Sequence, residues 1–96
     1  MNAREIEDHM LNRCMAVARN VPTVANDQQE ANVFRVAGMV MRSSFPPAAA
    51  NLMRASDNYF LAHPGDKLHA AEVVRHGWIF SLPRLRDMLT MKLQHR

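Results

Sequence analysis

Apolar residues recur every three or four positions along most of the chain, which is the pattern of amphipathic α-helices. In residues 3–20 this pattern places one apolar stripe along a helix. The stripe consists of Ala3, Ile6, Met10, Cys14 and Val17. Asn20 and Pro22 are expected to end this helix. No stretch alternates β-branched and polar residues over a strand's length, so the pattern predicts an all-α fold.

The segment that begins at Asn26 is predicted to be a helix with apolar residues on nearly every side. Asn26 is expected to cap it, with Gln29 completing a variant of the capping box. A helix that is apolar all round must be buried on all sides, and 96 residues offer little interior for that. We therefore expect an intertwined homodimer with a shared helical core, in which Gly38 lets the partner backbone approach. The expected dimer core consists of Val33, Phe34, Ala37, Val40 and Met41.

A third helix is expected to begin at Ser44 or Phe45, with Pro46 in its first turn, where the missing N–H is harmless. It should end before Pro64, because the residue that precedes a proline is pushed out of helical geometry. The connections on both sides are short, and the chain contains no repeat and no long linker. We expect residues 1–96 to form a single domain.

The rest of the chain is expected to form a fourth helix over about residues 67–80, capped by Asp66, and a fifth that begins at Ser81. Pro83 stands in the first turn of that fifth helix. Alternatively, Pro83 kinks one long helix that runs over residues 67–95. Either arrangement gives four to five short helices per chain.

Composition agrees with a folded protein that is not embedded in a membrane, since 48% of the residues are hydrophobic and 22% are charged. The densest apolar run, residues 33–41, is interrupted by Arg35 and is far shorter than the roughly 20 residues that a bilayer requires. The charged N-terminus does not resemble a signal peptide. Cys14 is the only cysteine and fits a reducing compartment. We expect a cytoplasmic protein of bacterial type.

Charge is distributed unevenly along the sequence. The formal net charge is +3, and ten of the twelve basic residues are arginine. Residues 1–48 sum to zero, so the whole excess lies in residues 49–96. A basic surface attracts polyanions, of which nucleic acid is the commonest in the cytoplasm. The arginine preference is equally typical of GC-rich genomes.

The charge distribution favours a small regulatory or accessory protein that binds double-stranded DNA without catalysing a reaction. The expected phosphate contacts are Arg75, Arg84, Arg86 and Lys92, followed by Lys67 and Arg54. The double substitution of Arg84 and Arg86 by alanine is expected to abolish this binding and to leave the fold intact. The alternative is that these side chains form an ordinary solvated surface.

A helix-turn-helix is one way in which such a protein could bind DNA. The third and fourth predicted helices meet across residues 63–66, a turn that contains glycine. The residues that would then point outward from the second of these helices are Lys67, His69, Glu72, Arg75 and His76. Pro64 is awkward in so compact a turn, and the alternative is a plain helical hairpin.

Catalytic and metal-binding chemistry are not indicated. Cys14 lies on an apolar stripe, and three isolated glycines cannot form a phosphate-binding loop. His69, Glu72 and His76 share one helix face, but the two histidines would lie roughly 10 Å apart along the axis. We therefore expect no enzyme activity, no metal and no cofactor.

The eight methionines support an alternative function. Methionine is flexible and adapts to varied apolar partners. Those that could line a groove for an amphipathic helix are Met39, Met41, Met53, Met88 and Met91. The protein would then be a dimeric protein–protein adaptor or a secretion-type chaperone, although its basic charge is unusual for such chaperones. The simpler interpretation is that these side chains fill the core.

Overall fold

The computed structural model of the chain describes residues 2–19, 24–65 and 67–94. The described residues form five helices and no strand, which confirms the all-α prediction. The helices are α1 (Ala3–Ala18), α2 (Gln28–Met41), α3 (Pro46–Ala62), α4 (Ala70–Arg75) and α5 (Leu82–Gln94). Within the described residues, no helix is both long enough and apolar enough to cross a bilayer.

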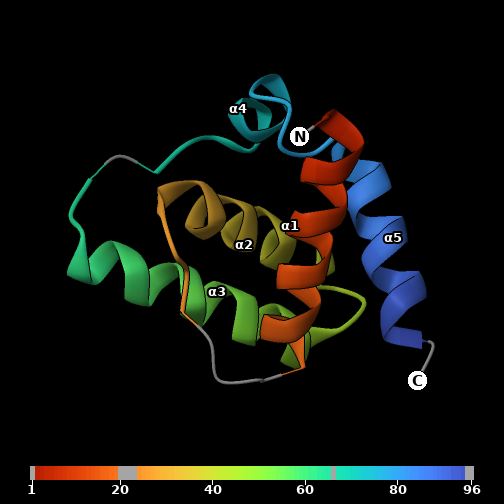
Figure 1. Ribbon diagram of the computed structural model, residues 1–96. Coiled ribbons are helices and arrows are strands. Elements are labelled where there is room, and N and C mark those ends of the chain that lie inside the picture. The colour runs from red at the N-terminus through yellow and green to blue at the C-terminus, as the bar shows by residue number, and fades with distance from the viewer. Residues whose placement is uncertain (1, 20–23, 66, 95–96) are drawn as a thin grey trace.

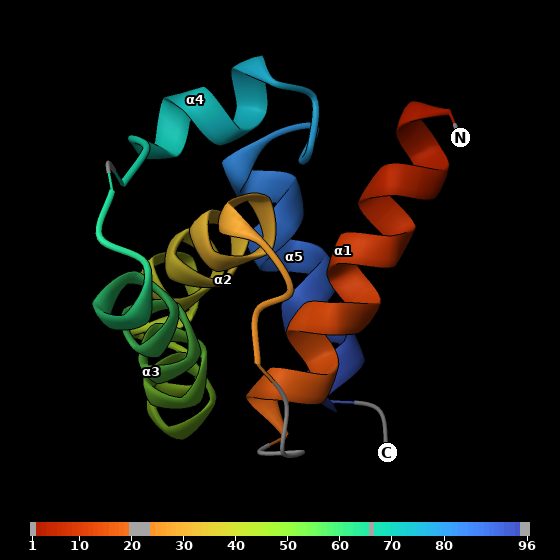
Figure 2. The ribbon, with the colours of Figure 1, turned by 60° about the vertical axis from the view of Figure 1, so that its left-hand side comes forward.

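The fold is built around α2. This helix packs against each of the other four, most extensively against α3, which runs back along it in the opposite direction (Figure 1). α1 and α5 lie side by side and run in the same direction across the α2–α3 pair (Figures 1 and 2). The short α4 lies over the beginning of α2 at the end of the molecule where α1 begins.

A single chain is enough to enclose most of α2. Val33, Phe34, Ala37 and Met41 have no exposed surface, and Val40 is partly buried. A second copy is therefore not required to bury these residues, because α1, α3, α4 and α5 together surround the helix. The homodimer stays a prediction, but the burial of α2 no longer supports it.

Gly38 allows a close approach within the chain, between α2 and α3. A Cβ atom at this position would lie 2.7 Å from Cγ of Met53 and 3.1 Å from the carbonyl oxygen of Ala49. Both distances are shorter than ordinary contacts. The small residue at position 38 is thus explained by helix packing inside one chain.

The beginning of α2 differs from the prediction by one residue. Asp27 is the N-cap, and its Oδ1 accepts a hydrogen bond of 2.8 Å from the backbone N–H of Glu30. Asn26 instead donates its backbone N–H to the Glu30 carboxylate at 3.1 Å. Asn and Asp are equally good caps. Asn26 is bound to the buried carboxylate of Glu30, and Asp27 therefore serves as the cap.

The ends of α1 and α3 follow the sequence signals. α1 begins after its N-cap Asn2, whose Oδ1 accepts the N–H of Glu5 at 2.9 Å, and it ends at Ala18. Asn20 and Pro22, expected to end this helix, lie outside the described residues. α3 begins with Pro46 after Phe45 and ends at Ala62, as predicted.

The predicted helix over residues 67–80 is wrong in extent, because only residues 70–75 are helical. Gly77 adopts a φ of 76°, its N–H bonds to the Val74 carbonyl, and the N–H of Trp78 bonds to the Val73 carbonyl. This pair of bonds is the Schellman motif that ends helices at a left-handed glycine. Asp66, the expected cap, lies outside the described residues.

α5 is a separate helix, which excludes one long kinked helix over residues 67–95. Ser81 precedes it, and its Oγ accepts the N–H of Arg84 at 3.1 Å, as a helix cap does. Leu85 and Leu89 carry the buried face of α5. The prediction of a fifth helix that begins at Ser81 with Pro83 in its first turn is confirmed.

Candidate nucleic-acid interface

Arg84, one of the expected phosphate contacts, holds a buried carboxylate. Glu7 on α1 is 2% exposed, and its Oε1 accepts a bond of 2.9 Å from Nε of Arg84. Its Oε2 accepts the backbone N–H of Phe80 at 3.0 Å. Removing one partner of such a pair leaves an uncompensated buried charge. The expectation that Arg84 can be replaced with no effect on the fold is therefore corrected.

Three other expected contacts take part in exposed ion pairs. Arg75 donates to Glu72, Nε of Arg86 lies 3.4 Å from Oδ1 of Asp87, and Nζ of Lys67 lies 3.7 Å from Oδ1 of Asp57. Surface pairs of this kind contribute little to stability. Each nevertheless places a negative charge directly beside the cation.

The arginines of α4 and α5 share their end of the molecule with the acidic beginning of α1 (Figures 1 and 2). We call this region the mixed-charge end. Its cations are Arg4, Arg75, Arg84 and Arg86. Its carboxylates are Glu5, Glu7, Asp8, Glu72 and Asp87. The positive charge that accumulates late in the sequence is offset there in space.

Arg84 and Arg86 also point in different directions around α5. Residues two apart on an α-helix are separated by roughly 160° around its axis, because each residue turns the helix by about 100°. Asp87 lies between them on the exposed side of the helix by the same geometry. Arg84 and Arg86 therefore do not form the single basic face that the sequence suggests.

The helix-turn-helix prediction is wrong. α3 ends at Ala62 and α4 begins at Ala70, so the connection is too long for that motif, and α4 has only six residues. The connection is held against α2 instead, because the fully buried Asn32 accepts the N–H of Leu68 through Oδ1 at 2.9 Å.

The opposite end of the molecule gathers cations from three helices. Nη2 of Arg19 donates to the Lys92 carbonyl at 3.2 Å, which joins the ends of α1 and α5. Nδ2 of Asn51 donates to the Ala18 carbonyl at 3.1 Å, and Oδ1 of Asn51 lies 3.5 Å from Nη1 of Arg54. These bonds place Arg19, Arg54 and Lys92 near one another, where α1 and α5 end beside the middle of α3. The ends of α1 and α5 can be followed in Figure 1.

We call this region the basic end. It includes Arg42, the C-cap residue of α2, because the preceding Met41 contacts α5 through its Sδ, which lies 3.9 Å from Oγ1 of Thr90. Its cations come from residues 14–19, 42–56 and 88–94, and none of these stretches contains an aspartate or a glutamate. Arg42 and Arg54 are exposed, and Lys92 is partly buried. The net charge of the chain is therefore concentrated at this end.

Two of the expected contacts, Arg54 and Lys92, belong to the basic end, whereas Arg19 and Arg42 were missed. The sequence signal for the missed pair is the absence of carboxylates from three separate stretches. The absence of carboxylates indicates a basic surface only once the fold shows that these stretches lie close together.

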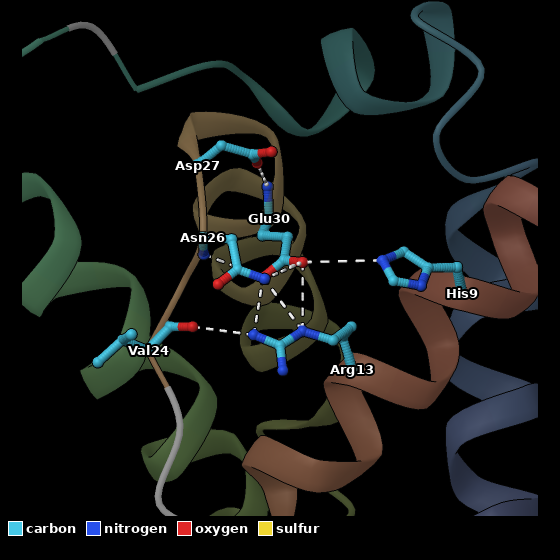
Figure 3. A network of polar contacts seen from close by, with 6 residues as sticks. All are labelled: His9, Arg13, Val24, Asn26, Asp27 and Glu30. Atoms are coloured by element: carbon cyan, nitrogen blue, oxygen red, sulfur yellow. Dashed lines mark hydrogen bonds and ion pairs between the residues drawn. The ribbon is translucent and has the colours of Figure 1, made fainter.

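A second buried carboxylate links α1 to α2 (Figure 3). Nε of Arg13 lies 3.2 Å from both carboxylate oxygens of Glu30, and Nη2 of Arg13 lies 3.0 Å from Oε1 and 2.9 Å from the Val24 carbonyl. Nδ2 of Asn26 donates to Oε2 at 3.3 Å, and Nε2 of His9 lies 3.8 Å from that oxygen. The network fixes the segment that leads into α2.

Burial and the polar contacts of this network shift two pKa values. Burial raises the pKa of Glu30, but hydrogen bonds from Arg13 and Asn26 outweigh it, so the pKa lies below its ordinary 4.5. Burial, together with the nearby negative charge of Glu30, raises the pKa of Cys14 to about 12. The Cys14 thiol therefore stays protonated at neutral pH.

Metal-ligating side chains do not cluster in the part of the chain that the structure describes. Within residues 2–19, 24–65 and 67–94, no three histidine, cysteine or acidic side chains come together in a way that could hold an ion. His76 lies 3.9 Å from Glu72, while His69 stands at the other end of α4.

Comparison with known proteins finds no matching family model, no matching curated protein and no matching solved structure.

Proposed function

We propose that this protein binds double-stranded DNA without sequence preference, through phosphate contacts from the basic end. The observation that carries the proposal is the convergence of Arg19, Arg54 and Lys92 where α1 and α5 end beside the middle of α3, in stretches that contain no carboxylate. DNA carries about one negative charge per 1.7 Å of its axis, so a compact group of cations can contact several phosphates together.

The proposed binding depends on charge rather than on the reading of bases. Arginine presents a planar set of donors that suits phosphate oxygens, and Arg42 and Arg54 are exposed. The helix-turn-helix that would have inserted a helix into the major groove is not formed. A protein of this kind acts as an accessory factor that holds or covers DNA, with no catalytic step.

The test is fluorescence anisotropy of a labelled duplex of random sequence, titrated with the protein at about 50 mM and about 200 mM salt. Binding through phosphates weakens steeply with salt, with a slope of about −0.9 per phosphate neutralised. We expect saturable binding at the lower salt and a large loss at the higher. Absence of binding at about 50 mM would overturn the proposal.

Two double variants locate the contact surface. Arg54→Ala with Lys92→Ala removes two charges from the basic end and should weaken binding about tenfold, lowering the salt slope by about two. Arg75→Ala with Arg86→Ala removes the same charge from the mixed-charge end, where each arginine already faces a carboxylate. This control should retain most of the affinity, and equal losses in the two variants would contradict the assignment.

A further inference from the structure

A cleft of about 380 Å³ lies between the end of α2 and the beginning of α3. Its walls are formed mainly by small and apolar residues, among them Met39, Pro46, Ala50 and Met53. Met39 is 51% exposed, which is a large apolar area for a residue on the central helix. The cleft is therefore the open side of an otherwise enclosed α2.

Arginine flanks this exposed methionine on both sides along α2. Arg35, Met39 and Arg42 are spaced by four and three residues, so they lie on one face of the helix. Nε of Arg35 is buried and has no hydrogen-bond partner in the described structure. Within the described residues, neither Arg35 nor Arg42 takes part in an ion pair.

We propose that this cleft binds an acidic amphipathic helix of a partner protein. One apolar side chain of the partner enters the cleft beside Met39 and Met53, and carboxylates on either side of it pair with Arg35 and Arg42. The two arginines are seven residues apart, or about 10 Å along α2. The partner therefore carries two acidic residues about two turns apart with an apolar residue between them. This interaction shares Arg42 with the proposed DNA-binding surface but does not use Arg19, Arg54 or Lys92.

The charge and shape of the cleft exclude other occupants. DNA phosphates gain nothing from the apolar walls, because burial of apolar surface requires an apolar ligand. A second copy of this chain lacks the matching pattern, since no two acidic residues of the sequence are seven positions apart. Apolar anchors on one helix face, flanked by charge, are the usual form of a helix that binds in a groove.

The probe is a fluorescein-labelled, alanine-rich helical peptide in which one leucine lies between two glutamates seven residues apart. A matched peptide carries glutamine in place of both glutamates. We expect saturable binding of the first peptide, with an affinity at least about tenfold above that of the second, as complementary charge at an interface implies. Equal binding of the two peptides, or no binding of either, would overturn the proposal.

Matched substitutions assign the binding to the cleft. Met39→Glu should lower the affinity for the acidic peptide by more than about tenfold. Met91→Glu adds the same charge at a methionine on α5 that is 49% exposed, and it should change the affinity less than about twofold. If the two variants lose affinity equally, or only Met91→Glu does, the peptide binds elsewhere and the proposal fails.

Two further measurements separate this proposal from its rivals. Arg54→Ala with Lys92→Ala should weaken DNA binding and leave the affinity for the acidic peptide unchanged within about twofold. A parallel loss of peptide binding would mean that the basic end captures the peptide by charge alone. Sedimentation velocity of the protein without peptide gives the oligomeric state, and a dimer that Met39→Glu dissociates would make a second copy the occupant and overturn the proposal.

Discussion

Glu7 and Glu30 are the two buried carboxylates of the described structure, and each is neutralised by an arginine from another segment. A buried charge is costly unless it is both paired and hydrogen-bonded. Glu7 meets this condition through Arg84 and the N–H of Phe80, and Glu30 meets it through Arg13 and Asn26. Both residues therefore fix the relative positions of the helices that they join.

The first prediction at the residue scale concerns Arg84. Replacement by alanine leaves the Glu7 carboxylate buried, and among the contacts described above only the Phe80 N–H still donates to it. We therefore expect the free energy of unfolding to fall by about 1–3 kcal/mol. Arg86→Ala removes an arginine of the same helix from an exposed pair and should change stability by less than about 0.5 kcal/mol. Urea unfolding of both variants checks this, and equal stabilities would contradict it.

The second prediction concerns the pH dependence that Glu30 creates. Since the pKa of Glu30 is lower in the folded protein than its ordinary 4.5, its stabilising contribution is present above pH 4.5 and is lost as the pH falls through the folded value. Glu30→Gln should be less stable than the unsubstituted protein at pH 7. The difference should shrink as the pH falls to about 3. Urea unfolding at both pH values measures it, and a constant difference would argue against this role.

These two carboxylates also mark a limit of sequence-based prediction. The apolar stripe of α1 correctly indicates Met10, Cys14 and Val17 as core residues. Glu7 and Glu30, however, stand near the beginnings of helices, where acidic residues are common because they complement the helix dipole. Their burial depends on arginines 77 and 17 residues away, which no local pattern reveals.

At the scale of the helices, local sequence signals predict a helix boundary correctly where neighbouring residues satisfy the free backbone N–H groups at the helix end. The proline at the beginning of α3 and the serine before α5 act as expected. The beginning of α4 is different, because Asn32 of α2 captures the N–H of Leu68 and holds residues 67–69 outside the helix. A buried side chain from a distant segment thus overrides the local helical preference.

The prediction at this scale concerns Gly77, whose φ of 76° ends α4. A Cβ atom added there meets nothing within 4 Å, so the cost of Gly77→Ala is purely one of backbone strain, about 1–2 kcal/mol. Gly65→Ala is the control, since its nearest contact is ordinary, at 3.9 Å, and its φ lies outside the left-handed region. It should be neutral or slightly stabilising. Thermal unfolding compares them, and equal destabilisation would contradict the explanation.

At the scale of the whole molecule, the order of charges along the chain does not give their arrangement in space. The sequence correctly indicates an excess of positive charge, but it assigns this excess to residues 49–96 and most of it to residues 75–96. Folding brings the acidic beginning of α1 beside α5 and to the same end of the molecule as α4, and it brings three stretches without carboxylates together at the other end. Only Arg54 and Lys92 of the expected contacts therefore lie at the basic end.

The hydrogen bonds of Glu7 have a consequence for synthesis on the ribosome. They join residues 73 and 77 positions apart, and contacts of such long sequence separation carry a high loop-closure entropy. While α5 is still inside the exit tunnel, the Glu7 carboxylate lacks both Arg84 and the N–H of Phe80 and stays in water. The beginning of α1 therefore takes up its final position against α5 only after residues 80–84 have emerged.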